Sequence, residues 1–208
     1  MSRLTPVHLT YNCAVMNKEA VRKIYNTKRK ELSPEAIQQQ SRAIAENFIA
    51  SAIWKNSKVI HIFISIPDKG EVDTSFLIDF FFTQHPEIKL CTSIISENGQ
   101  DLTHTHITSQ TTYLSNKWNI PEPVERTAID EKDVDLVLLP LLAFDGKGNR
   151  VGYGKGFYDR FLQKCKTEVL KVGLSLFEPT EELIDADTWD VPLDYGIGPE
   201  KLYGFNVG

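Results

Sequence analysis

The sequence lacks the features that mark membrane, secreted and nucleic-acid-binding proteins. Its 208 residues contain no long apolar run of the length that a transmembrane helix needs. The three cysteines, Cys13, Cys91 and Cys165, are far apart and do not have the spacing of a zinc site, which favours free thiols in a reducing cytoplasm. Lysine and arginine total 23 against 28 aspartate and glutamate residues, a net charge of −5. Binding to nucleic acid or to an anionic membrane is therefore not expected.

The N-terminal segment also lacks a continuous apolar stretch, so it does not have the form of a secretory signal peptide. Met16 directly precedes the first segment with helical periodicity. We therefore expect residues 1–15 to be a flexible N-terminal extension, or translation to begin at Met16. Residues 16–208 are expected to form a single cytoplasmic domain, either a monomer or a weak homodimer.

Helix-like and strand-like patterns alternate along the chain. Helices are predicted over residues 18–32, with Asn17 as N-cap, and from Pro34 onwards, with Ser33 as N-cap. Two nearly continuous apolar runs are typical of strands covered on both faces. These runs are residues 59–66 and 135–142; further strands are predicted at 88–92, 102–107 and 169–176, further helices near 76–81 and at 157–166, and an irregular segment at 113–133. The alternation predicts a three-layer α/β sandwich, in which helices cover both faces of a largely parallel sheet.

A glycine-rich stretch lies between a predicted strand and a predicted helix. It reads Arg150-Val-Gly-Tyr-Gly-Lys-Gly-Phe-Tyr-Asp159. Alternate glycines allow several backbone N–H groups to approach an anion, and Arg150 and Lys155 add positive charge. Asp159 is placed to hold a Mg²⁺ ion that bridges phosphates. Because α/β proteins bind ligands at the carboxyl ends of their strands, the stretch predicts a phosphate site.

This stretch matches neither standard nucleotide motif. A Walker loop needs serine or threonine where Gly156 stands, and a dinucleotide fingerprint needs glycine where Phe157 stands. A tight turn that caps a helix is the alternative. The basic face formed by Lys18, Arg22 and Arg29 in the first helix is likewise typical of a solvated helix surface. The residues alone leave these readings open.

The histidines offer little evidence for a metal site. His104 and His106 are two residues apart in a predicted strand, but no third ligand lies nearby in the sequence. A surface or hairpin pair is the preferred interpretation. His61 lies within an apolar run and is predicted to be a core histidine rather than a catalyst.

Four landmarks occur in the order in which one known family has them. They are Lys18-x3-Arg22 with Leu32-Ser33 after it, Glu71-Val-Asp-Thr74, Trp118-Asn-Ile-Pro-Glu-Pro123, and Leu139-Pro-x-Leu-x-Phe-Asp145 running into the glycine-rich stretch. The closing motif Trp189-Asp-Val-Pro-Leu-Asp194 is similar as well. Together they resemble the 5-formyltetrahydrofolate cyclo-ligase family, also called 5,10-methenyltetrahydrofolate synthetases. Phe157 departs from the family pattern, which often has tyrosine there.

The resemblance implies an enzyme that uses ATP and Mg²⁺ to close 5-formyltetrahydrofolate to 5,10-methenyltetrahydrofolate, through a phosphorylated formyl group. It assigns ATP binding to Lys18, Arg22, Arg150, Val151, Gly152, Tyr153, Gly154, Lys155, Gly156, Phe157 and Tyr158, with Lys155 and Arg150 catalytic. It assigns folate binding to Ile64, Glu71, Trp118, Phe157 and Tyr158. It assigns Mg²⁺ to Asp159 and Asp190.

Two other classes of function are alternatives. A sugar-phosphate isomerase or an acyl-transfer protein with a similar layered fold would bind phosphate without turning over ATP. A folate- or nucleotide-binding regulator would have kept the shape and lost the reaction. Loss of Lys155 or Asp159 would mark such a regulator, and both residues are present.

Overall fold

An eight-stranded sheet forms the centre of the computed structural model, which describes residues 12–117 and 119–205. Its strands are β2 (Val59–His61), β3 (Lys89–Ile95), β4 (Leu102–Ile107), β7 (Ala128–Ile129), β8 (Leu136–Pro140), β11 (Leu170–Leu174), β13 (Tyr195–Ile197) and β14 (Leu202–Gly204). Their spatial order is β14-β13-β11-β8-β2-β3-β4-β7. The central strands from β13 to β3 pair in parallel, and β14, β4 and β7 are antiparallel. The predicted, largely parallel sheet is confirmed.

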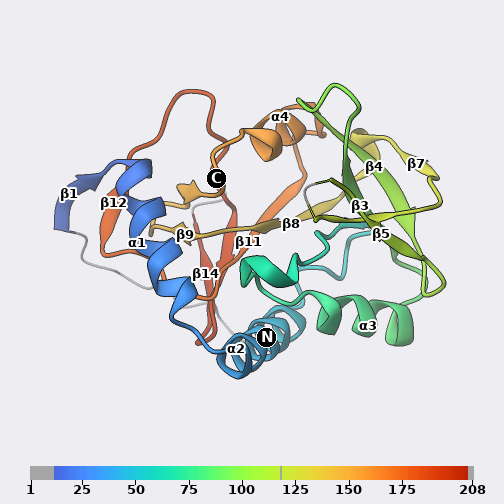
Figure 1. Ribbon diagram of the computed structural model, residues 1–208, viewed down its shortest axis with the longest axis horizontal. Helices are drawn as coiled ribbons and strands as arrows, with labels where there is room; N and C mark the ends of the chain where they lie inside the picture. The colour runs from blue at the N-terminus through green and yellow to red at the C-terminus, as the bar shows by residue number, and fades with distance from the viewer. Residues whose placement is uncertain (1–11, 118, 206–208) are drawn as a thin grey trace.

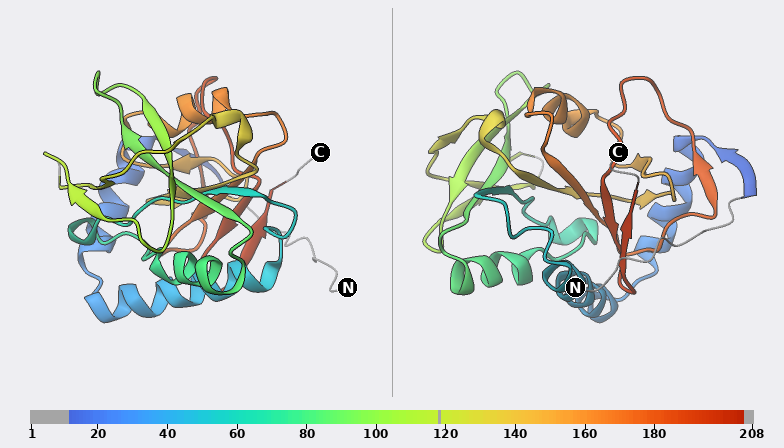
Figure 2. Two further views of the ribbon diagram at one scale, coloured as in Figure 1. Left: turned by 90° about the vertical axis from the view of Figure 1, so that its right-hand side faces the viewer. Right: turned by 180° about the vertical axis from the view of Figure 1, so that it is seen from behind.

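Helices cover both faces of this sheet (Figures 1 and 2). On one face lie α2 (Pro34–Ser51) and α3 (Ser75–Gln84), and on the other lies α4 (Phe157–Lys164). Helix α1 (Lys18–Lys30) packs beside the sheet, and two 3-10 turns are η1 (Pro67–Lys69) and η2 (Glu131–Asp133). The three-layer arrangement is thus as predicted. None of the helices in the described part of the chain is long and apolar enough to cross a membrane.

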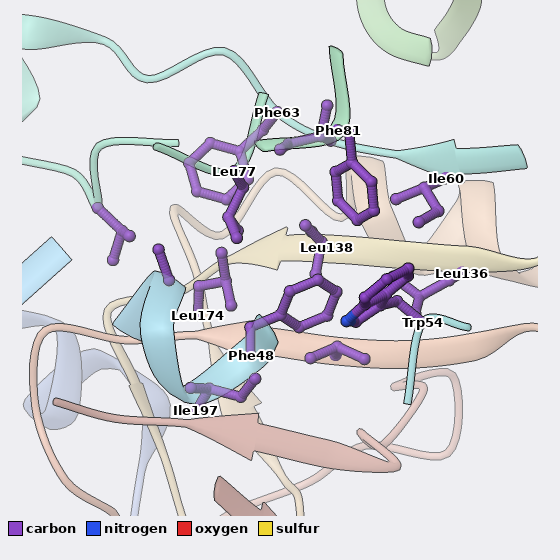
Figure 3. Close-up of a cluster of buried hydrophobic side chains, with 14 of the residues drawn as sticks. Phe48, Trp54, Ile60, Phe63, Leu77, Phe81, Leu136, Leu138, Leu174 and Ile197 are labelled. Carbon is purple, nitrogen blue, oxygen red and sulfur yellow. The ribbon is translucent and has the colours of Figure 1, made fainter. Parts of the chain in front are cut away.

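The larger hydrophobic core lies between the sheet and the α2–α3 layer (Figure 3). Phe48 of α2 and Phe81 of α3 meet edge to face there, with ring centroids 6.3 Å apart. Strand β8 turns Leu136 and Leu138 toward this core, and Val137 and Leu139 toward the core beneath α4. Because alternate side chains of a strand point to opposite faces, burial on both faces explains the continuous apolar run at residues 135–142.

The first two helices begin where their predicted caps place them. The Asn17 side chain accepts a hydrogen bond from the N–H of Ala20 at 2.8 Å. The Ser33 hydroxyl accepts one from the N–H of Ala36 at 3.2 Å. Such caps satisfy backbone donors that have no partner within the helix. The first of them fixes Lys18 at the start of α1.

Three small sheets border the main one. Strand β1 (Asn12–Met16) pairs with β12 (Glu182–Ile184), β5 (Tyr113–Ser115) with β6 (Pro121–Pro123), and β9 (Ala143–Phe144) with β10 (Arg150–Val151). The expected boundary between an extension and the domain, after residue 15, falls inside β1. Residues 1–11 lie outside the described residues.

Some predicted elements differ in length from those observed. The strand predicted over residues 59–66 ends at His61, because side chains replace the strand partner beyond it: Thr74 Oγ1 donates to the carbonyl of Phe63 at 2.7 Å. The segment 113–133, predicted to be irregular, contains the short strands β5, β6 and β7. Because β2 ends at His61, Phe63 and Ile64 leave the sheet and line a cavity.

Candidate active site

A cavity of about 530 Å³ lies at the carboxyl ends of β8, β2 and β3. Its lining includes the last residues of these strands and the residues after them, among them Pro140, Phe63 and Ser93. This is where parallel sheets bind their ligands. The volume is within the range of pockets for cofactors and drug-sized molecules, roughly 300–1,000 Å³.

The glycine-rich stretch forms one wall of this cavity, together with the start of α4. Gly154 has a φ of +86°, and a Cβ atom there would lie 3.0 Å from Cζ of Arg22. Glycine therefore lets the loop approach the arginine that α1 extends toward it. Arg22 Nε donates to the carbonyl oxygen of Gly152 at 3.1 Å. Helix α1 and the loop thus build the cationic wall jointly.

Cations and carboxylates alternate on this wall. Lys18 forms an ion pair with Asp190, and its Nζ atom lies 3.2 Å from Oδ2 of Asp187. Arg150 Nη2 donates to Oδ1 of Asp159 at 2.8 Å. The two pairs are neighbours, because Asp159 Oδ1 also accepts the N–H of Val191 at 3.2 Å. All four members of the pairs Lys18–Asp190 and Arg150–Asp159 line the cavity, and Asp187 does not.

Asp159 and Asp190, the residues predicted to hold Mg²⁺, both line the cavity, and each is paired with a cation. Carboxylate oxygens are hard ligands, and Mg²⁺ at phosphate sites is usually held by one or two carboxylates, with phosphate oxygens and water completing its shell. Within residues 12–117 and 119–205, no group of three or more His, Cys, Asp or Glu side chains is arranged to hold a metal. A closed metal centre made of protein ligands alone therefore finds no support there.

Another part of the cavity lining is apolar and contains one buried carboxylate. The apolar side chains are Phe63, Ile64, Ile66, Ile95, Leu102 and Ile120. Glu71 is 7% exposed. Its Oε1 accepts the hydroxyl of Tyr153 at 2.6 Å and its Oε2 accepts the N–H of Ile66 at 2.8 Å. Burial raises the pKa of Glu71, and these two hydrogen bonds act against that rise.

Two buried histidines lie behind this part of the lining. His61 Nε2 is 2.7 Å from Oγ of Ser93, which lines the cavity, and His104 stacks on Phe161 with ring centroids 3.9 Å apart. Burial lowers the pKa of both imidazoles, that of His104 to about 4, so both rings are neutral near pH 7. The core position predicted for His61 is confirmed. His104 and His106 lie in the antiparallel β3–β4 pair, which agrees with the hairpin alternative. The surface alternative is wrong for His104, because α4 covers β4 and His104 is 4% exposed.

Residues 14–197 match the family model described as the 5-formyltetrahydrofolate cyclo-ligase family. The chain belongs to this family. A relative named probable 5-formyltetrahydrofolate cyclo-ligase from Schizosaccharomyces pombe is 32% identical over 205 residues, covering 90% of this chain and 97% of the relative. The 5-formyltetrahydrofolate cyclo-ligase of Mus musculus is 30% identical, covering 85% of this chain and 91% of its own.

Solved structures agree with this membership. The NMR structure of Aquifex aeolicus 5,10-methenyltetrahydrofolate synthetase superposes with a TM-score of 0.74 at 29% identity, covering 92% of this chain and 94% of that one. A 5,10-methenyltetrahydrofolate synthetase from Mycoplasma pneumoniae shares the fold, with a TM-score of 0.68 at 24% identity, covering 88% of this chain and 99% of that one. The cyclo-ligase fold therefore extends over nearly the whole chain.

The cyclo-ligase cavity brings together the predicted site residues from distant parts of the sequence. Those that line it are Lys18, Arg22, Ile64, Glu71, Arg150, Gly152, Tyr153, Gly154, Lys155, Gly156, Phe157, Tyr158, Asp159 and Asp190. Val151 does not line it: its side chain is 1% exposed and packs with Val21 and Leu142, because alternate residues of β10 face opposite ways. Trp118 lies outside the described residues, although Ile120 and Glu122 beside it do line the cavity.

Several lining residues were not singled out in the sequence. Ser93 comes directly after the strand predicted at 88–92, so its place at a strand's carboxyl end was a usable signal. Glu122 belongs to the landmark that begins at Trp118. It accepts hydrogen bonds from the N–H of Ile95 at 3.2 Å and from Asn116 Nδ2 at 2.9 Å, and these contacts hold the segment against the cavity.

Proposed function

We propose that this member of the cyclo-ligase family catalyses the ATP-dependent cyclisation of 5-formyltetrahydrofolate to 5,10-methenyltetrahydrofolate, with release of ADP and phosphate. One observation carries the proposal. A single cavity is lined both by the cationic, glycine-rich stretch and by apolar side chains with a buried carboxylate among them. Phosphate groups and a flat heterocycle need these two environments side by side.

The glycine-rich wall is the nucleotide end in this proposal. Lys18 and Arg22 of α1, with Arg150 and Lys155, supply positive charge for the phosphates, and the loop supplies backbone N–H groups. Mg²⁺ held by Asp159 and Asp190 would offset the negative charge that builds on the phosphate oxygens during transfer. The two ion pairs, Lys18 with Asp190 and Arg150 with Asp159, keep these four side chains at the cavity wall.

The apolar wall is the folate end. Glu71 offers a carboxylate of fixed orientation, which suits the N–H donors of a pterin. Ile64, Phe157 and Tyr158 line the cavity with surfaces that a flat ring can contact. Trp118 is proposed to contact the pterin as well, and the position of Ile120 and Glu122 on the cavity wall supports this.

The proposed reaction has two steps. The formyl oxygen attacks the γ-phosphorus, an O–P bond forms, and ADP leaves, which gives an iminium phosphate. N10 of the folate then attacks the former formyl carbon, the C–O bond breaks, phosphate leaves, and N10 loses its proton. The protein need not supply a covalent nucleophile, because phosphoryl transfer depends chiefly on positioning and on charge neutralisation. Lys155 and Arg150 are proposed to provide that neutralisation.

The direct test is to mix the protein with ATP, Mg²⁺ and 5-formyltetrahydrofolate and to follow the near-ultraviolet absorbance of the methenyl product. The expected result is a signal that requires ATP and is accompanied by stoichiometric ADP. Absence of an ATP-dependent signal would contradict the proposal. A regulator would bind both ligands without product, and a phosphate-binding isomerase would leave ATP intact. A cytoplasmic location and a monomer or weak homodimer stay predictions.

A further inference from the structure

Arg29 is a buried arginine in the last turn of α1. Arg29 is 6% exposed, although the sequence places it on the same basic helix face as Lys18 and Arg22. That face was compatible with a solvated surface, and for Arg29 this interpretation is wrong, because the glycine-rich loop and the carboxyl end of β8 cover it. Lys18 and Arg22 line the cavity, and Arg29 lies behind its wall.

The guanidinium of Arg29 joins three segments of the site. One of its terminal nitrogens, Nη2, donates to the backbone carbonyl of Leu141, just beyond β8. The other, Nη1, donates to the hydroxyl oxygen of Tyr153 at 3.3 Å. Tyr153 in turn donates to Oε1 of Glu71 at 2.6 Å. A single chain of hydrogen bonds thus runs from α1, through the glycine-rich loop, to the folate end of the cavity.

Close packing supports this arrangement from the other side. Gly70, the residue before Glu71, has a φ of +57°, and a Cβ atom there would lie 3.3 Å from Cγ of Arg29. The left-handed conformation favours glycine, and the lack of a side chain lets the backbone beside Glu71 rest against the arginine stem. The position of Arg29 and the position of Glu71 are therefore coupled through both hydrogen bonds and contact.

The burial of this charge is costly for the fold. Removing a guanidinium from water is unfavourable unless its donors are satisfied, and Arg29 Nε has no hydrogen-bond partner within residues 12–117 and 119–205. The buried guanidinium of Arg29 is therefore expected to have a role other than stabilising the fold.

We propose that Arg29 is a positioning residue for folate binding, because its guanidinium orients the Tyr153 hydroxyl and, through it, the Glu71 carboxylate that receives the pterin. This inference rests on the proposed function. A hydroxyl has one proton, and since the Tyr153 oxygen accepts from Arg29, its own proton is left for Glu71. Arg29 does not touch either substrate in this account. It acts through the two residues that do.

The same contacts affect the protonation of Glu71. Burial raises the pKa of this carboxyl; the hydrogen bonds from Tyr153 and Ile66 and the charges of Arg29 and Lys69 lower it, in that order. Burial raises the pKa of Tyr153 and of Tyr158, and the charge of Glu71 adds to the rise at both hydroxyls. Without Arg29, fewer groups oppose the effect of burial, so Glu71 takes up a proton at higher pH. A protonated Glu71 accepts fewer hydrogen bonds from the pterin.

The test is the equilibrium binding of 5-formyltetrahydrofolate at pH 6 and pH 8.5, without nucleotide, to the wild-type protein and to the variants Arg29→Met and Arg29→Lys. The wild type gives the reference ratio of the affinities at the two pH values. Arg29→Met should lose more affinity than the wild type between pH 8.5 and pH 6, because Glu71 takes up a proton at higher pH in this variant. Arg29→Lys restores the charge and should recover most of the loss at pH 6.

Controls separate this role from a merely structural one. Arg42→Met removes an exposed arginine from α2 and should match the wild type at both pH values. Tyr153→Phe removes only the bridging hydroxyl, so it should reproduce the direction of the Arg29→Met effect even if Arg29→Met does not fold. The inference is overturned if folded Arg29→Met binds like the wild type at pH 6, or if Tyr153→Phe shows no pH-dependent loss. A wild-type protein that does not bind the folate contradicts the proposed function itself.

Discussion

Three of the four paired side chains at the nucleotide end, Lys18, Asp159 and Asp190, keep 18%, 21% and 21% of their surface exposed, whereas Glu71 at the folate end is 7% exposed as a residue. The fourth, Arg150, keeps 8% of its side-chain surface exposed. Charges near solvent can change partners at little cost, which suits a site where phosphates enter and leave. A buried carboxylate needs fixed donors, which suits recognition of one heterocycle. Substitutions at the first end should therefore impair turnover, and substitutions at the second should impair folate binding.

The largest expected effect is on turnover at the nucleotide end. Lys155→Ala and Asp159→Ala should each lower kcat by two orders of magnitude or more, about 2.7 kcal/mol of barrier. Both side chains line the end where charge develops during phosphoryl transfer. Steady-state rates of methenyl product formation measure this. Lys147→Ala, which removes an exposed lysine from a neighbouring turn, is the matched control. Near-wild-type rates in both active-site variants would mean that the nucleotide end is misplaced.

Stability should depend on pH through the histidines behind the folate end. His104 titrates at about 4 in the folded protein, below its ordinary 6.5. Between these values the unfolded chain binds more protons, so the free energy of unfolding should fall with falling pH, by roughly 2 kcal/mol between pH 6.5 and 5. Urea unfolding at both pH values measures it. His104→Gln should lose much of this dependence, whereas His106→Gln on the same strand should retain it; equal behaviour of the two variants would refute the assignment.

Glu71→Gln should weaken folate recognition with little change in chemistry. The amide keeps the shape of the side chain and replaces a charged acceptor by a neutral one, a difference of about 1.4 kcal/mol that corresponds to a roughly tenfold higher KM for 5-formyltetrahydrofolate. The KM for ATP should stay within about twofold, because the side chains proposed to bind the phosphates are unchanged. Initial rates with each substrate varied in turn give both constants. A change confined to the KM for ATP would contradict the assignment of Glu71 to folate binding.

Trp118→Ala should have the smallest effect, a rise of a few-fold in the folate KM that exceeds the fall in kcat. An aromatic contact with a flat ring contributes about 0.5–1.5 kcal/mol beyond the area that it buries. The same initial-rate measurements apply. A variant that loses kcat and keeps its folate KM would contradict a pocket-lining role for this residue.

The two ends also differ in how far the sequence revealed them. Gly154, Lys155 and their neighbours lie close together in the chain, and their chemistry is visible as a local pattern. The strands and the caps at Asn17 and Ser33 were predictable for the same reason, since periodicity and capping are local. At the folate end only the resemblance supplied Ile64 and Glu71, and Phe63 and Ile120 were missed, because these residues meet only after β2 and β3 pair and the chain leaves the sheet.

Burial is the property that local patterns conveyed least well. Arg29 and His104 both sit in contexts that suggested exposure, a basic helix face and a pair of histidines in a strand. Each is covered by an element distant in sequence, Arg29 by the glycine-rich loop and His104 by α4. Val151 shows the converse: its place inside the glycine-rich stretch suggested a ligand contact, and the alternation of β10 turns it into the core.

The central claim is that the formyl oxygen accepts the γ-phosphoryl group within this one cavity. It is tested most directly with 5-formyltetrahydrofolate that carries ¹⁸O in the formyl group, incubated with the protein, ATP and Mg²⁺ and analysed by mass spectrometry. The account predicts one ¹⁸O atom in each molecule of released phosphate and none in ADP. Methenyl product accompanied by unlabelled phosphate, with the label appearing in water, would contradict it.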